Sequence, residues 1–139
     1  MQSLHDVVGM NVNGADKPDG RVTDLIIGAA IEVHRALGPG LLEATYEECL
    51  AYELGERNLT VQRQPARPVT YKGTQLSIGY RPDFIVEKTV IVELKTIERF
   101  LPVHTAQVLT YLKLEGLRVG LLLNFNCRWM VSGIKRVVL

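Results

Sequence analysis

The stretch that decides the fold of this chain is Tyr80-Arg-Pro-Asp-Phe-Ile-Val-Glu-Lys-Thr-Val-Ile-Val-Glu-Leu-Lys-Thr-Ile97. Two short apolar runs flank Glu87-Lys88-Thr89, and this pattern is typical of two strands joined by a tight turn. We therefore expect a β-hairpin with strands over residues 82–86 and 90–95.

Charged residues lie at the ends of these two predicted strands. Successive side chains of a strand point to opposite faces, so Glu93 and Lys95 share a face with Ile91 while Leu94 points the other way. A charged pair at the end of an apolar strand is costly to bury without a partner. Asp83 begins the other strand and can meet Glu93 across the hairpin. Two acids with a lysine one pleat away suit a divalent metal ion and its bound water.

The remaining segments predict an α/β fold. Thr23 is a suitable N-cap for a first helix, which Gly38-Pro39-Gly40 ends. The apolar run at 118–125 predicts a strand buried on both faces, and a helix separates it from the strand ending at Lys95. Such a connection favours a right-handed parallel crossover, and hence a mixed central sheet with helices on both faces. The expected elements are helices at 23–37, 41–57 and 101–114, a polar edge strand at 60–66, strands at 69–71 and 76–79 around a turn at Lys72-Gly73, the hairpin above, the strand at 118–125 and a last strand or hairpin around Ser132-Gly133.

The chain has 139 residues, 47% of them apolar, which is enough for one compact domain with a real core. Residues 1–20 show no sustained period, and we expect a flexible N-terminal tail followed by a single domain at 21–139. The net charge of +1 gives no global electrostatic attraction to nucleic acid, so binding would need a local patch.

The sequence favours a cytoplasmic protein. Cys49 and Cys127 lack metal-site spacing and are expected to be free thiols of a reducing compartment. No apolar run reaches the roughly 18 to 20 residues that a membrane span needs, and no secretory signal is evident.

Three spaced motifs together resemble a known group of enzymes. Pro82-Asp83 followed by Glu93-Leu94-Lys95 resembles the PD-(D/E)XK, or restriction-endonuclease-like, nuclease superfamily. Gln107 and Tyr111 resemble the Q-x-x-x-Y motif of its RecB-like branch, in which many members also have an acid upstream, as Glu43 is here. The segment Gly40-Leu-Leu-Glu-Ala-Thr-Tyr46 is similar to the signature of the small bacterial proteins named GxxExxY, which are grouped with the same superfamily. The resemblance extends from about Thr23 to Phe125.

The resemblance implies a restriction-endonuclease-like core and a Mg²⁺-dependent nuclease, with Mn²⁺ as a possible substitute, that acts on DNA or RNA. In this interpretation Glu43, Asp83 and Glu93 are metal ligands, and Lys95 positions or activates the attacking water. Gln107 contacts the water, Lys95 or the substrate. A chain this small has little surface for reading a sequence, so a homodimer or a partner protein is also expected.

Each site residue also has a plain structural interpretation. An acid at Glu43 is favoured by the helix dipole alone, and Glu93 with Lys95 can form a cross-strand ion pair. Tyr111 and His104 lie on the same helix side as Gln107 and either line the site or serve as packing and solvated residues. His34 is either a hydrogen-bonded core residue or a neighbour of Glu43.

The rival hypothesis for the whole chain is a non-catalytic binding or assembly module that retains the nuclease fold. The near-neutral charge favours it, whereas the intact set of Asp83, Glu93 and Lys95 disfavours it.

Overall fold

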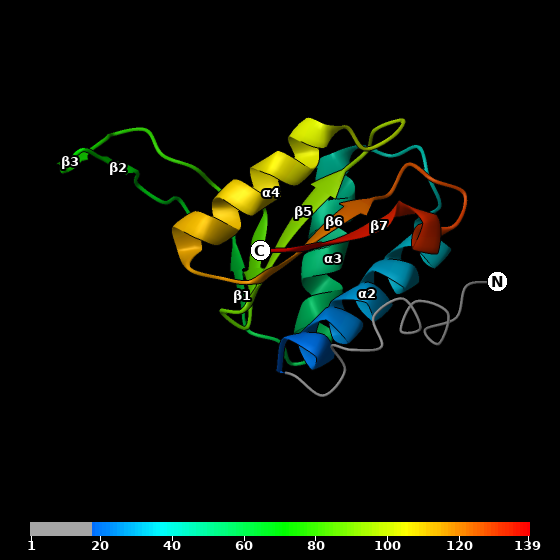
Figure 1. Cartoon of the computed structure of the whole chain (residues 1–139). Coiled ribbons are helices and arrows are strands. Elements are labelled where there is room, and N and C mark those ends of the chain that lie inside the picture. Colours follow the sequence, from blue (N-terminus) through cyan, green and yellow to red (C-terminus); the bar gives the residue numbers. More distant parts are fainter. Residues whose placement is uncertain (1–17) are drawn as a thin grey trace.

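The structure is a computed structural model that describes residues 18–139 (Figure 1). A five-stranded sheet with the order β1-β4-β5-β6-β7 forms its centre, and a separate two-stranded ribbon joins β2 and β3. Only β5 and β6 run parallel, so the sheet is mixed as predicted. The elements are α2 (Pro18–Leu37), α3 (Glu43–Glu56), β1 (Val61–Arg63), β2 (Thr70–Tyr71), β3 (Thr74–Gln75), β4 (Phe84–Val86), β5 (Val90–Lys95), α4 (Pro102–Glu115), β6 (Val119–Asn124), the 3₁₀ turn η2 (Met130–Gly133) and β7 (Ile134–Val138).

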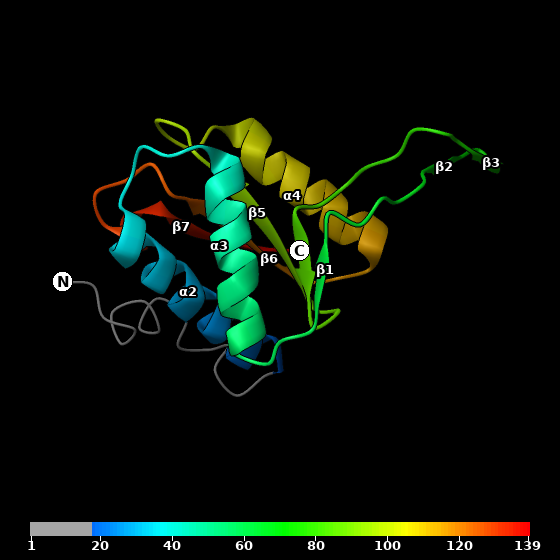
Figure 2. The same ribbon diagram turned by 180° about the vertical axis from the view of Figure 1, so that it is seen from behind.

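Helices cover both faces of the sheet, as the two opposite views show: α2 and α3 pack on one face and α4 on the other (Figures 1 and 2). The alternation of β5 supplies both cores. Val90, Val92 and Leu94 belong to the larger core under α2 and α3, and Ile91 belongs to the smaller core under α4. Glu93 and Lys95 therefore lie on the α4 face at the end of the strand.

The parallel crossover is confirmed, because α4 connects β5 to its parallel neighbour β6. Gly120 permits the close approach of this helix, since a Cβ there would lie 2.5 Å from Cγ1 of Val108. The approach of α4 to β6 places the N-terminus of α4 beside the end of β5, where Lys95 lies.

The predicted start of the first helix is wrong. The helix begins at Pro18, and Thr23 lies inside it, where its hydroxyl donates to the carbonyl of Gly20 at 2.9 Å instead of capping the end. The first turn of α2 thus includes the last three residues of the expected tail, and residues 1–17 lie outside the described part.

Two strand predictions also need correction. The edge strand expected at 60–66 is reduced to β1, because Gln64 adopts a φ of 48° and turns the chain out of the sheet. The strand expected at 76–79 is not formed, because β3 pairs with β2 directly after the Lys72-Gly73 turn and ends at Gln75. Of the last strand or hairpin expected around Ser132-Gly133, the strand is confirmed: β7 follows the 3₁₀ turn η2 and pairs with β6.

The segment between β1 and β4 forms an arm that projects away from the rest of the molecule (Figures 1 and 2). Its tip is the β2–β3 ribbon around Lys72-Gly73, and its base is closed by an antiparallel bridge between Arg67 and Tyr80. Gly79 is required there, because a Cβ would lie 1.7 Å from the carbonyl oxygen of Arg67. Residues 71–79 of the arm are all exposed.

Among residues 18–139, no helix combines the length and the apolar character that crossing a bilayer requires. Cys49 and Cys127 are both free thiols, as expected.

Candidate functional site

Asp83 and Glu93 meet across the β4–β5 hairpin at one end of the sheet. The backbone N–H of Asp83 donates to Oε1 of Glu93 at 2.9 Å, and the N–H of Leu94 donates to Oδ2 of Asp83 at 2.8 Å. Each carboxyl group is thus held by the backbone of the opposite strand. The expected meeting of the two acids across the hairpin is confirmed.

Burial raises the pKa of both carboxyl groups of the pair. Burial, and then the negative charge of Asp83, raise the pKa of Glu93 to about 8. Burial also raises the pKa of Asp83, although hydrogen bonds from Leu94 and Glu93 oppose the change. The charge of Asp83 and the burial of both groups therefore favour the protonated form of Glu93. Two acids so placed favour a nearby cation over a proton when one is available.

Lys95 and Glu43 lie within electrostatic range of this pair. The charge of Lys95 lowers the pKa of Asp83, Glu93 and Glu43 alike, so its ammonium group lies within electrostatic range of all three. Burial, followed by the charges of Asp83 and Glu47, raises the pKa of Glu43 despite Lys95. Glu43 is nevertheless exposed, at the first position of α3.

The loop before Glu43 is fixed by Tyr46. The Tyr46 hydroxyl donates to the carbonyl of Gly38 at 2.5 Å and accepts from the N–H of Leu41 at 3.2 Å. Its ring is fully buried and stacks on Phe125 at 4.6 Å between centroids. The Gly40-to-Tyr46 motif thus holds the chain entering α3, and with it Glu43.

Gln107 and Tyr111 extend the site along α4. The amide Nε2 of Gln107 donates to the Tyr111 hydroxyl at 3.1 Å. Burial raises the pKa of Tyr111, as do the charges of Glu93 and Asp83, so the phenol lies near the acid pair. The ring of Tyr111 stacks on Tyr80 at 5.2 Å between centroids. These rings form a wall that leads from the acid pair toward the arm.

The two histidines have other partners. The buried imidazole of His34 hydrogen-bonds through Nε2 with the carbonyl of Cys127 at 2.7 Å, on the loop after β6. Nδ1 of His104 accepts from the N–H of Leu101 at 2.9 Å and caps the first turn of α4. His34 and His104 therefore bond to backbone groups, whereas Gln107 and Tyr111 bond to each other, with Tyr111 within electrostatic range of the acid pair.

Glu47 and Gln64 support Asp83 and were not predicted from the sequence. Glu47, buried one turn after Glu43, accepts from Nε2 of Gln64 at 2.8 and 2.9 Å and from Arg63 at 3.3 Å. The backbone N–H of Gln64 donates to the carbonyl of Asp83 at 2.8 Å. Gln64 thereby joins α3 to the start of β4. The position of Glu47, one helical turn after Glu43, could have indicated a second acid near the site. Its hydrogen bonds to Gln64 become evident only in the folded structure.

Asn124 is a second residue that the sequence did not reveal. It ends β6 beside Lys95, and its side chain accepts from the N–H of Ile97 at 3.1 Å and donates to the carbonyl of the same residue at 2.8 Å. The N–H of Phe125 also donates to the carbonyl of Lys95 at 2.9 Å. These bonds fix the chain immediately after Lys95.

The donor chemistry of the site fits a hard divalent cation. Mg²⁺ prefers oxygen ligands and commonly takes one or two carboxylates while keeping several waters. The Asp83–Glu93 pair supplies two such groups, and the charge of Asp83 that raises the pKa of Glu93 is the repulsion that a bound cation would relieve. Within the described part of the chain no three His, Cys, Asp or Glu side chains form a ready-made metal group, so Glu43 does not join the pair in this arrangement.

A sequence model of the family described as the PD-(D/E)XK nuclease superfamily matches residues 20–137 of the chain. The match reaches every strand of the central sheet and includes Glu43, Glu47, Asp83 and Glu93. Comparisons with curated proteins and with solved structures gave no match.

Proposed function

Since the chain belongs to the PD-(D/E)XK nuclease superfamily, we propose that it is a Mg²⁺-dependent nuclease that hydrolyses phosphodiester bonds of DNA or RNA. Membership of the superfamily implies nucleic-acid binding, and its nucleases generally use divalent metal ions. The single observation that supports the proposal most is the Asp83–Glu93 pair, held by two backbone hydrogen bonds and faced by Lys95.

The residues would divide the work as follows. Asp83 and Glu93 would hold the metal, with Glu43 available from α3. A bound divalent cation supplies a more acidic water and neutralises charge on the phosphate. The N–H of Phe125 holds the backbone carbonyl of Lys95, and the ammonium group of Lys95 would orient the water. Gln107 holds the Tyr111 hydroxyl and presents its remaining amide groups to the water or the substrate.

We further infer that the chain is of the GxxExxY type within the RecB-like branch. Two features support this inference. The Tyr46 hydroxyl hydrogen-bonds to Gly38 and Leu41 on either side of Gly40, so the spacing from Gly40 to Tyr46 allows this tyrosine to fix the loop before α3. Gln107 and Tyr111, the residues of the Q-x-x-x-Y pattern, bond to one another beside the acids.

Metal binding and cleavage measured together test the proposal. The first experiment is calorimetric titration of Mg²⁺ and Mn²⁺ into the wild type, Asp83→Asn and Glu56→Gln. Nuclease assays on labelled single- and double-stranded DNA and RNA accompany it. Asp83→Asn keeps an oxygen that can accept from Leu94 but removes the negative charge. Glu56→Gln is the matched control, because Glu56 is an exposed acid at the far end of α3.

Loss of both metal binding and cleavage in Asp83→Asn alone supports the nuclease. A wild type that neither binds metal nor cleaves any of the four substrates refutes it and favours the rival, a non-catalytic binding or assembly module. In that case the acid pair would serve only as a structural contact between the two strands.

The remaining parts of the proposal concern the context of the protein. We propose that residues 21–139 act as one domain in the cytoplasm, in keeping with the two free thiols. A homodimer or a partner protein is supported by exposed apolar side chains on the arm, since Tyr71, Leu76 and Ile78 are 59%, 42% and 81% exposed. Light scattering of the wild type and Ile78→Asp tests this. A dimer that dissociates in the variant identifies a second copy as the partner, and a monomer in both excludes it.

A further inference from the structure

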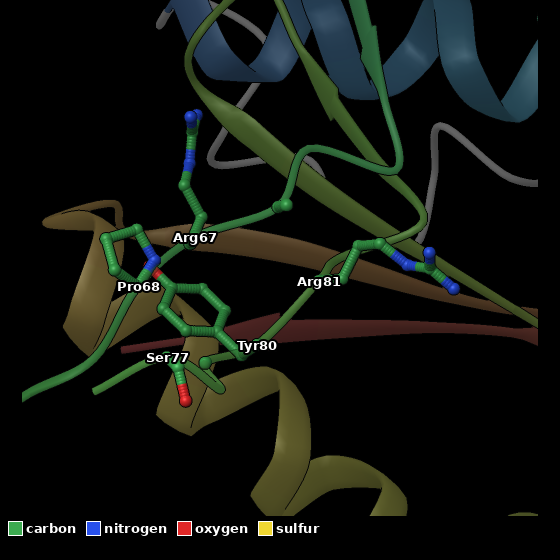
Figure 3. Close-up of a pocket in the computed structure, with 7 residues that line it drawn as sticks. Arg67, Pro68, Ser77, Tyr80 and Arg81 are labelled. Atoms are coloured by element: carbon green, nitrogen blue, oxygen red, sulfur yellow. The ribbon is translucent and has the colours of Figure 1, made fainter.

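A hollow of about 430 Å³ lies at the base of the arm, beside the candidate site (Figure 3). Its volume falls within the range of small-ligand sites. The hollow lies between the outgoing and returning chains of the arm, and its lining contains no acidic side chain. The lining residues are Ala66, Arg67, Pro68, Ser77, Gly79, Tyr80 and Arg81.

The two arginines of the hollow differ in their charge balance. Arg67 donates to Glu115 at 3.1 Å and to Gln62 at 2.7 Å, so its charge is met within the chain. Arg81 is exposed and has no ion-pair partner among residues 18–139. Its guanidinium group extends away from that of Arg67 (Figure 3). Arg81 is therefore free to bind an anion that runs past the hollow.

An aromatic ring forms part of the hollow. The ring of Tyr80 lies beside Pro68 in the close-up view (Figure 3). The Tyr80 hydroxyl bonds to the carboxylate of Glu115, and Tyr111 stacks on the ring, so its orientation is fixed from two directions. A fixed ring next to an unpaired arginine is the combination that binds single-stranded nucleic acid, by stacking a base and holding its phosphate.

The hollow and the acid pair belong to one continuous surface. Arg81 is two residues before Asp83, and Tyr80 contacts Tyr111, whose pKa responds to the charges of Asp83 and Glu93. A strand that reaches the acid pair can therefore place an adjacent nucleotide in the hollow without leaving the surface.

Resting on the proposed nuclease function, we propose that this hollow is a binding subsite for one unstacked nucleotide of a single strand next to the cleaved bond. Arg81 binds the phosphate, and Tyr80 with Pro68 contacts the base and sugar. A single strand fits this site because a base inside a duplex is covered on both faces by its stacked neighbours, whereas an unstacked base has a free face for a side chain. The substrate class is accordingly a single strand, or a duplex with a single-stranded end.

Binding without cleavage tests the subsite separately from the chemistry. The probe is a fluorescein-labelled 12-nucleotide single strand, measured by anisotropy against the full-length chain in EDTA at several salt concentrations. Arg81→Gln should weaken binding about fivefold to tenfold and flatten the salt dependence by about 0.7 of a logarithmic slope unit, as loss of one phosphate contact requires. Arg81→Lys should keep the slope. Ala66→Trp fills the hollow with no change of charge, and should weaken binding while leaving the salt slope intact.

Lys88→Gln is the matched control, since Lys88 is an exposed cation in the turn at the opposite end of the β4–β5 hairpin from Asp83. Three outcomes would each overturn the subsite. They are equal effects of Arg81→Gln and Lys88→Gln on binding, tighter binding of a blunt duplex than of the single strand, and no binding by the wild type. The nuclease proposal fails differently. A wild type whose Arg81-dependent binding persists, but which cleaves nothing with Mg²⁺ or Mn²⁺, keeps the subsite and loses the nuclease. Cleavage by a protein whose binding does not depend on Arg81 keeps the nuclease and loses the subsite.

Discussion

Replacement of Glu93 by glutamine should stabilise the metal-free protein at pH 8. Glu93 is only 4% exposed, and burial together with the Asp83 carboxylate raises its pKa from 4.5 to about 8. Glutamine has nearly the same shape and keeps a carbonyl oxygen that can accept from the N–H of Asp83. The substitution therefore removes the titration with little change in packing.

The magnitude follows from the shift in pKa. Between pH 4.5 and about 8 the folded protein binds a proton at Glu93 that the unfolded chain has released, so the free energy of unfolding falls as the pH rises. Below pH 4.5 both states are protonated and the penalty vanishes, whereas above pH 8 it is complete. One proton contributes at most about 1.4 kcal/mol per pH unit. We expect Glu93 to cost about 2 kcal/mol of stability between pH 6 and pH 8, which corresponds to a melting temperature lower by roughly 8 °C.

Urea unfolding in EDTA at pH 6, 7 and 8 measures this effect as the difference between the wild type and Glu93→Gln. The difference removes the titration of the histidines and of exposed acids, which both proteins share. The variant should become progressively more stable relative to the wild type as the pH rises. Parallel pH profiles would refute the reasoning. A wild type that gains stability over the variant at pH 8 would show instead that the attraction between Glu93 and Lys95 outweighs burial.

Three further predictions concern how the surroundings of the site are held. Gly79→Ala should destabilise the protein by about 1–3 kcal/mol in thermal unfolding, because the added Cβ would meet the carbonyl of Arg67. The control Gly55→Ala, with open space around it on α3, should instead stabilise the protein by about 0.5–1 kcal/mol. Equal effects of the two substitutions would contradict the steric reason. Tyr46→Phe should lose about 1–2 kcal/mol, because two hydrogen bonds to the loop before α3 disappear while the stacked ring remains, and an unchanged urea midpoint would count against it. Asn124→Ala should accelerate amide hydrogen exchange in the loop after β5, which its side chain holds, and unchanged protection there would exclude that role.

The order of the elements was readable from the sequence because each signal is local. Alternation in the hairpin assigned Ile91 and Leu94 to opposite cores, and the long apolar run at 118–125 indicated the buried parallel strand β6. Element ends were harder to predict. Thr23 has the chemistry of an N-cap, yet the helix continues one turn further back to Pro18, where proline suits the first turn. Gln64 ends β1 by adopting a left-handed backbone conformation, which the presence of a glutamine in the sequence does not predict.

The candidate site was predictable to the extent that its residues follow regular spacing. Asp83 and Glu93 meet because hairpin pairing brings the starts and ends of adjacent strands together, and Gln107 bonds Tyr111 because they are one helical turn apart. His34 and His104 show the limit of this reasoning. Of the two alternatives for His34, the structure shows the hydrogen-bonded core residue, and His104 caps the first turn of its own helix. The sequence pattern does not specify the loops that supply these backbone partners.

The supporting contacts around Asp83 explain why the sequence could identify the acids but not what holds them. Gln64 is 17 residues from Glu47 and 19 from Asp83 in the chain, yet its side chain bonds the first and its backbone bonds the second. No periodicity connects such positions, because they belong to a helix, a strand end and the start of another strand. The same contact has a functional consequence. The arm leaves the sheet directly after Gln64 and returns at Asp83, so the Glu47–Gln64 bond fixes the point from which the arm and the acid pair diverge. The base of the arm and the backbone of Asp83 are therefore held by one anchor, as the proposed subsite beside the acid pair requires.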